Sequence, residues 1–386
     1  MRHAKWLTLV VLVLHAAPIA AQQPPEPTTF RDRLVQNMKE PDQGGGLHLT
    51  KHFAVVFGGI KQGSAAALGP AVSSKFKDGS YVQLKAVYSI KHFKLLQGRY
   101  DSRTFWAERV MLSARARYQD APELPVFRLG QESPRLKVDY GEIKRELSAK
   151  LLAKLSPLVR MSGGFGMERY STTGGRIEKE DQLEGKTLPE IPPLPGIDSR
   201  AWYAHTFVAG AIDSRPSTDY SRHGGVVELA AHDYHNRQNA LQSFERYELT
   251  AEQLLPMFAE RGVLDLSAET WLSHSSGDRS VPFFLMPTLG GGNLLRGYGS
   301  YRFRDRDALL LQAEYRWAVH KMLDVAGLYE IGKVASVWRG LSLRHSARSF
   351  AAGIRAHSAT TNLFRADLAH GREGFSFKVG FSTGGS

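Results

Sequence analysis

The 386-residue chain contains no cysteine, which excludes disulfide cross-links, a lipid-modified N-terminal cysteine and thiolate metal sites. Its formal net charge of +12 is spread along the chain, without the dense basic block that a nucleic-acid-binding arm would show. Two interpretations of this charge stay open: a basic lumen and rim facing anionic lipopolysaccharide or anionic solutes, or ordinary solvated charge. We expect no nucleic-acid partner.

The N-terminus has the features of a secretory signal peptide. Arg2 and Lys5 precede a mostly apolar run from Leu7 to Leu14, and several small residues follow that run. The run is too short to span a bilayer by itself. We therefore predict export, a signal peptide over residues 1–21 that is cleaved near Ala21, and a short periplasmic segment over residues 22–46.

From about residue 47 to residue 381, apolar and polar residues alternate with a period of two, in segments repeated at roughly 20-residue intervals. Between Ala308 and Trp317, for example, the apolar residues fall on one face of a strand, whereas Gln312, Glu314 and Arg316 fall on the other. Beyond the N-terminus, no stretch of about 18 apolar residues could form a membrane helix. A soluble β-sandwich and a membrane barrel both remain possible.

Aromatic residues near the predicted strand ends favour the membrane barrel. Tyr88, Phe93, Tyr118, Trp317 and Phe375 occupy such positions, and aromatic girdles at the two membrane interfaces are typical of transmembrane barrels. Ordinary β-propensity is the alternative explanation. We predict an all-β fold, a single antiparallel transmembrane β-barrel over residues 47–386.

The alternation predicts fifteen strands by inspection, at residues 47–59, 66–76, 81–95, 109–118, 136–147, 158–170, 202–212, 226–234, 244–254, 263–272, 308–317, 325–334, 350–357, 363–370 and 375–381. Because bacterial single-chain barrels close with an even number of strands, we expect 16 with one missed or merged, and 14 as the alternative. Longer connections containing Pro and Gly are expected at 120–134, 171–200 and 273–307. The second is rich in proline, which a sheet tolerates poorly, and is expected on the cell surface.

The glycine-rich segment Thr288–Ser300 reads TLGGGNLLRGYGS. It is not a phosphate-binding P-loop, because Tyr298 and Gly299 follow Gly297 where a P-loop has Lys and then Ser or Thr. We expect no nucleotide partner. Adjacent pairs such as His232 and Asp233 would point to opposite faces of a strand and could not cooperate readily in catalysis. The sequence therefore predicts no enzyme, no metal site and no cofactor.

Within this segment, Leu295, Arg296, Gly297 and Tyr298 form a motif that resembles the signature loop of the bacterial surface antigen family of outer-membrane assembly factors. The similarity continues into the five predicted strands that follow, notably over residues 314–316, 328–334 and 353–355. The resemblance implies a BamA/TamA-like barrel in which this loop folds back into the lumen and its arginine meets acidic residues of the inner wall. The space between residues 22 and 47 is too short for the periplasmic polypeptide-transport-associated domains of that family.

Alternation supplies two acidic partners for Arg296. Glu314 and Glu330 both point inward and lie on adjacent predicted strands, where two carboxylates side by side would favour a cation between them. The free-energy cost of removing a guanidinium from water is low enough only when the group pairs with a carboxylate. We therefore predict that Arg296 is held by Glu314 and Glu330. The alternative is a solvated loop above a wet lumen.

The chain ends on an alternating strand with Phe375, Phe377, Val379 and Phe381, which resembles the closing strand of the family. By resemblance, the protein assists insertion or translocation of polypeptide or lipid, and requires a weak seam near Ala54 and Phe377. A passive pore or structural surface barrel is the alternative, and a pore requires a continuous seam and an open lumen. The expected location is the outer membrane, with its lipid and lipopolysaccharide as partners, together with other envelope proteins.

Overall fold

The computed structural model describes residues 46–135, 137–174, 194–197 and 200–381. The predicted signal peptide and nearly all of the predicted segment over residues 22–46 lie outside these residues. Within them, the chain forms β-strands and three short 3-10 helices. No helix of this part is long and apolar enough to cross a membrane.

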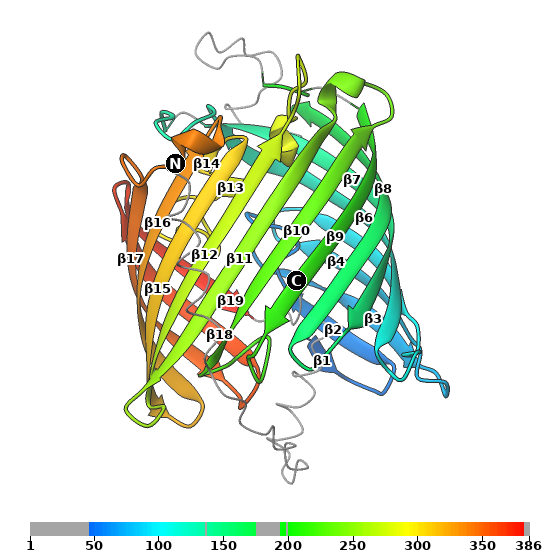
Figure 1. Cartoon of the computed structure of the whole chain (residues 1–386), viewed down its shortest axis with the longest axis vertical. Helices are drawn as coiled ribbons and strands as arrows, with labels where there is room; N and C mark the ends of the chain where they lie inside the picture. The colour runs from blue at the N-terminus through cyan, green and yellow to red at the C-terminus, as the bar shows by residue number, and fades with distance from the viewer. Residues whose placement is uncertain (1–45, 136, 175–193, 198–199, 382–386) are drawn as a thin grey trace, which may run out of the picture.

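Sixteen antiparallel strands form a nearly closed barrel, which confirms the predicted fold class and strand number. Figure 1 shows the strands tilted around a common axis. They are β2 (Phe53–Gly58), β3 (Ala67–Lys75), β4 (Tyr81–Ser89), β5 (Lys94–Asp101), β6 (Val110–Phe127), β7 (Lys137–Lys154), β8 (Val159–Gly174), β9 (Arg200–Asp213), β10 (Gly224–Asn236), β11 (Phe244–Met257), β12 (Gly262–His274), β15 (Asp307–His320), β16 (Leu323–Ala335), β17 (Ala347–His357), β18 (Asn362–Gly371) and β19 (Gly374–Phe381).

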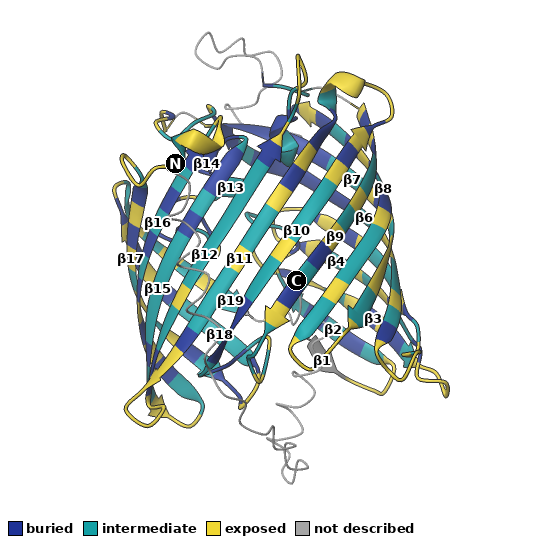
Figure 2. Ribbon diagram, in the orientation of Figure 1, coloured by how far each residue is buried: buried dark blue, intermediate teal, exposed yellow. Residues whose placement is uncertain are grey.

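Strand alternation separates an apolar outer face from a polar lumen. On β19, Phe375 and Phe377 are 76% and 67% exposed on the outside, whereas Glu330 on β16 is fully buried in the lumen. The repeating bands of exposed and buried residues along the strands are visible in Figure 2. An apolar outer surface is what a strand needs in contact with lipid.

The predicted strand over residues 81–95 covers β4, the turn at Ile90–Phe93 and only the first two residues of β5, so β5 was missed as a separate strand. This turn contains neither Gly nor Pro, and His92 supplies the left-handed conformation with a φ of 62°. Sequence patterns detect turns chiefly through Gly and Pro, which explains why β5 was missed. Phe93 was expected in an aromatic girdle but is fully buried beneath the connections of the barrel.

The predicted connection over residues 120–134 is shorter than expected, because β6 continues to Phe127. A β-bulge between Ala121 and Leu124 absorbs the irregularity, and Pro125 still lies opposite Asp139 of β7. The third expected connection agrees with the structure, since β12 ends at His274 and β15 begins at Asp307. Most of the proline-rich second connection lies outside the described residues.

The connection over residues 275–306 folds into the end of the barrel that also carries connections 128–135 and 336–346, here called the loop end. It includes the small sheet of β13 (Thr288–Leu289) and β14 (Phe303–Arg304). Its apolar side chains enter all three buried clusters of the described chain, and these side chains are Phe283, Tyr301, Leu289, Leu295, Tyr298, Phe303, Val281 and Met286. This apolar packing fills the loop end of the lumen.

The described residues of the first and last barrel strands, β2 and β19, are not paired with each other as those of all other neighbouring barrel strands are. Antiparallel registers join every consecutive pair from β2 round to β19, including β9 with β10 and β12 with β15. β2 and β19 are the first and last strands of the nearly closed barrel, and among the described residues no register joins these two strands. Instead, the short strand β1 (Gly46–His48) pairs with residues 54–56 of β2. We call the junction of β2 and β19 the seam.

Candidate functional site

The motif Leu295–Tyr298 lies inside the barrel at the loop end, where it contacts the inner wall. Leu295 is fully buried in the apolar cluster with Leu310 of β15 and Val334 of β16. Its φ of 63° is a left-handed conformation, which leucine seldom adopts and which packing must hold in place. The chain reverses here, so that the following arginine points toward the wall.

Arg296 is 6% exposed and binds two carboxylates from different strands. Its Nη1 donates to Glu330 Oε1 on β16 over 2.8 Å, and its Nε lies 3.3 Å from Asp367 Oδ2 on β18. The backbone N–H of Arg296 also donates to Glu330 Oε2, at 2.5 Å. The side chain and the backbone N–H of Arg296 thus both bind the buried carboxylate of Glu330. Hydrogen bonds between charged groups of this kind are strong.

Glu314 does not contact Arg296, in contrast to the prediction from alternation. It faces the lumen, but the register places it opposite Leu328, while Gln312 lies opposite Glu330. Glu314 therefore lies one lumen-facing position farther from the loop, and it pairs with Arg355 of β17 over 2.9 Å and 3.2 Å.

The acidic residue missed by sequence reasoning is Asp367. Besides its ion pair with Arg296, it accepts a hydrogen bond from Arg355 Nη1 at 2.6 Å, so Arg355 links Asp367 to Glu314. Positive and negative groups alternate from Glu330 through Arg296, Asp367 and Arg355 to Glu314. The alternation of side chains along β18 could have identified Asp367 as a lumen-facing candidate. It could not have shown which cation Asp367 contacts.

Gly297 is required by close approach of two backbones. Its N–H donates to Ser349 Oγ at 2.7 Å, and a Cβ at this position would lie 2.7 Å from the backbone nitrogen of Gly371 on β18. A Cβ on Gly371 would in turn lie 2.7 Å from the Gly297 carbonyl oxygen. The two glycines let the loop lie directly on the wall.

The closing strand β19 holds the same loop through its lumen-facing side chains. Ser376 Oγ donates to the Arg296 carbonyl at 2.6 Å, and Lys378 Nζ donates to the Tyr298 carbonyl at 3.2 Å. The Tyr298 ring packs edge-on against Phe303, and its hydroxyl accepts from the backbone N–H of Arg372. Sequence analysis identified only the apolar residues of β19 and missed these two anchors.

The apolar residues of β19 lie on the other face. Phe375, Phe377 and Val379 are exposed on the outside of the barrel, and the backbone of Phe381 pairs with Phe364 of β18. The closing strand therefore offers apolar side chains outward and loop anchors inward.

The loop also reaches the other side of the seam. Gln62, in the connection between β2 and β3, donates its side-chain amide to the Gly290 carbonyl, and its own carbonyl accepts from the Tyr301 hydroxyl at 2.9 Å. Since Ser376 and Lys378 bind the same loop from β19, connection 275–306 spans the gap between first and last strands. It acts as a brace across the loop end of the seam.

Replacement of Gly297 with alanine is expected to displace the loop from β18, because overpacking a close contact costs about 1–3 kcal/mol. We expect a lower thermal midpoint and faster trypsin cleavage after Arg296 and Arg302 in the detergent-solubilised barrel. Gly299→Ala is the matched control, since a Cβ there has no atom within 4 Å. Equal cleavage rates in the two variants would contradict the docked loop.

Comparisons with known proteins place this geometry in a structural class. No model of a known protein family matches the sequence, and no curated protein matches it. Solved structures do match the fold. The crystal structure of BamA from Haemophilus ducreyi lacking POTRA domains 1–3 has a TM-score of 0.62 at 12% identity, covering 90% of this chain and 77% of that one.

Two structures of CdiB are also similar. CdiB from Escherichia coli has a TM-score of 0.54 at 11% identity, covering 86% of this chain and 62% of that chain. For CdiB from Acinetobacter baumannii the TM-score is 0.51 at 10% identity, with 86% and 59% covered. This chain thus spans about three-fifths of each CdiB chain. As the resemblance of the loop motif implied, the chain folds as a BamA-like barrel.

Proposed function

We propose that this protein is an outer-membrane barrel that assists insertion or translocation of polypeptide or lipid, with the seam between β2 and β19 as its opening toward the bilayer. The observation that carries the proposal is the seam itself, where no register joins β2 and β19 in the described chain, while registers join every consecutive pair of strands from β2 round to β19. An edge strand with unpaired backbone groups is a template on which another strand can pair.

Strand length supports a weak seam. β2 has 6 residues and β19 has 8, whereas β6 and β7 have 18 each. A strand that crosses a membrane takes about 9–11 residues. The seam is therefore built from the shorter strands, which can exchange fewer hydrogen bonds. The three-residue β1 on the free edge of β2 adds only a short ladder that an incoming strand could replace.

A passive pore is the second candidate. A lumenal cavity of about 870 Å³ beside β4–β8 favours it, whereas the apolar packing of connection 275–306 at the loop end argues against free passage. The expected partners are outer-membrane lipid, lipopolysaccharide and other envelope proteins. We also propose export through the N-terminal signal, and that the protein is not an enzyme.

Reconstitution tests the proposal directly. Liposomes containing the refolded full chain are expected to accelerate the folding of an unfolded eight-stranded outer-membrane barrel severalfold over empty liposomes, as measured by protease protection and by the mobility of unboiled samples. Liposomes containing an unrelated closed barrel at equal density control for bilayer defects. Equal rates with all three preparations would refute insertion of barrel substrates and leave the pore as the better function.

A further inference from the structure

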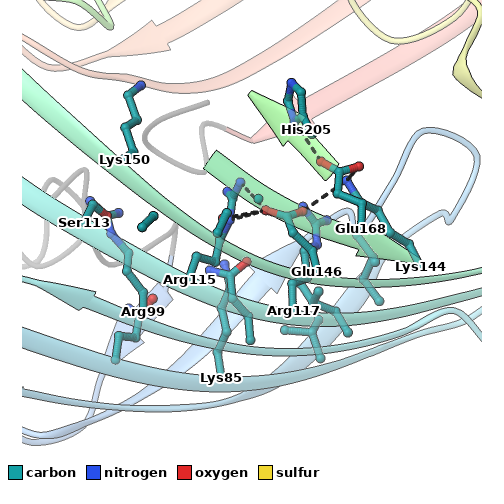
Figure 3. Close-up of a pocket in the computed structure, with 18 of the residues that line it drawn as sticks. Lys85, Arg99, Ser113, Arg115, Arg117, Lys144, Glu146, Lys150, Glu168 and His205 are labelled. Carbon is teal, nitrogen blue, oxygen red and sulfur yellow. Dashed lines mark hydrogen bonds and ion pairs between the residues drawn. The ribbon is translucent and has the colours of Figure 1, made fainter. Parts of the chain in front are cut away.

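The lumenal cavity has a basic wall that the loop and the seam do not use. It lies along β4 to β8 and is lined by six cationic residues against two acidic ones, Glu146 and Glu168. Figure 3 shows these side chains along the cavity, with Arg115, Arg117 and Lys144 gathered around Glu146 and with Lys150 set apart. The cations are Lys85 of β4, Arg99 of β5, Arg115 and Arg117 of β6, and Lys144 and Lys150 of β7.

Register brings like charges together on this wall. Arg99 of β5 lies directly opposite Arg115 of β6, and Gln97, the partner of Lys85, is also the partner of Arg117. Directly opposed side chains have Cβ atoms about 4.5–5.5 Å apart, and like charges at that spacing repel. The cost of this arrangement is offset when an anion binds between the cations.

The two carboxylates on the wall do not neutralise it. Glu146 receives Arg115 at 2.8 Å and Lys144 at 3.0 Å, and Glu168 receives Lys144 at 3.1 Å and is hydrogen-bonded to His205. Both carboxylates are therefore shared by groups at one end of the cluster.

Lys85 and Lys150 make no ion pair or hydrogen bond with any described residue; Lys150 lies over the Phe207 ring. Arg117 donates Nη2 to Gln119, but its Nε is buried without a hydrogen-bond partner in the same part of the chain. A buried guanidinium N–H without an acceptor is costly, so this group points to an absent acceptor.

The lumen-facing side chains of β10 to β12 carry five acidic groups against one arginine, Arg246, and the acidic groups are Glu228, Glu248, Glu252, Asp265 and Glu269. In Figure 1 these strands form the near wall, while β4 and β5 lie behind them. The wall of β4 to β8 is thus net basic and that of β10 to β12 net acidic, so a mobile anion in the lumen is drawn to the first and repelled from the second.

We propose that the basic wall binds a multiply charged oxyanion of the phosphate type, with Lys85 and Arg117, which share the partner Gln97, as its principal contacts and Lys150 as a further positive charge on the same wall. Guanidinium forks match the oxygens of a phosphate, and lysines add point charges that need no fixed geometry. The site stands independently of the proposed insertion function, because it requires neither the seam nor the loop to move.

Calorimetric titration of the refolded full chain with inorganic pyrophosphate, in zwitterionic detergent at low and high salt, tests the site. The Lys85→Gln, Lys150→Gln double variant is expected to weaken binding at least about tenfold. Lys91→Gln, Lys94→Gln is the control, because it removes the same charge from two exposed residues at the turn between β4 and β5 and at the start of β5. Similar affinities for the two double variants, or no binding by wild type, would overturn the proposal.

A second arm identifies the source of the phosphate. Monomeric short-chain phosphatidic acid is compared with pyrophosphate, and short-chain phosphatidylcholine controls for the acyl chains. Tighter binding of phosphatidic acid, lost in the Lys85 and Lys150 double variant, assigns the site to a lipid headgroup. Tighter binding of pyrophosphate assigns it to a soluble phosphate compound. Equal binding of phosphatidylcholine and phosphatidic acid would contradict recognition of charge and overturn the proposal.

Discussion

Replacement of Arg296 with alanine is expected to convert a barrel that is silent in planar bilayers into one that opens. The substitution leaves Glu330 and Asp367 buried without their shared cation. Removing one partner of a buried ion pair typically costs about 3–5 kcal/mol, because the remaining charge is uncompensated. The loop would then be held by its apolar packing, by its remaining hydrogen bonds and by the ion pair of Arg302 with Glu373, and we expect intermittent single-channel openings.

Arg339→Ala is the matched control for this experiment. Arg339 lies in the exposed connection between β16 and β17, where it stacks on Trp338 and forms no ion pair with a described residue. The control is expected to stay as silent as wild type. Large steady openings of the wild-type protein would defeat the loop-plugged lumen and favour a pore. A silent Arg296→Ala variant with unchanged thermal stability would show that the ion pairs are dispensable.

A covalent bridge across the seam is expected to reduce insertion activity to that of empty liposomes. Because the chain has no cysteine of its own, any disulfide that forms must join the two engineered cysteines. One cysteine can replace Val55 on β2 and the other Phe377 or Val379 on β19. Val55 lies on the same outer face as these residues, because the β3 residues on its face of the sheet have large, exposed side chains. Oxidation should abolish the acceleration of substrate folding, and reductant should restore it, because the edges of β2 and β19 become free again.

The control for the bridge is a pair within the continuous wall. Leu229 of β10 lies opposite Leu249 of β11, and cysteines at these positions should cross-link without loss of activity. Full activity of the oxidised seam variant would exclude lateral opening as the route. Failure of every seam pair to cross-link, while the control pair does, would indicate that β2 and β19 stand farther apart than a disulfide can span.

The sequence by itself determined the all-β class, limited the strand number to 16 or 14, and, through a resemblance, indicated the loop that folds into the lumen. A period-two pattern marks each lumen-facing residue without knowledge of its neighbours, because side-chain direction is a local property of the strand. The even-number rule then recovered the strand that the pattern had merged, although it could not place the turn at His92. The motif Leu295–Tyr298 likewise carried the likeness to BamA-type barrels.

Only the tertiary structure decided which charged groups meet. Alternation of side chains correctly placed Glu314 and Glu330 in the lumen. The register between β15 and β16, however, puts Gln312 beside Glu330, and Glu314 pairs with Arg355 instead. Asp367, distant in sequence, took the second place beside Arg296. The seam and the segregation of charge between the walls are likewise properties of closure. Register and closure depend on contacts between residues far apart in the chain, and a local pattern contains no information on them.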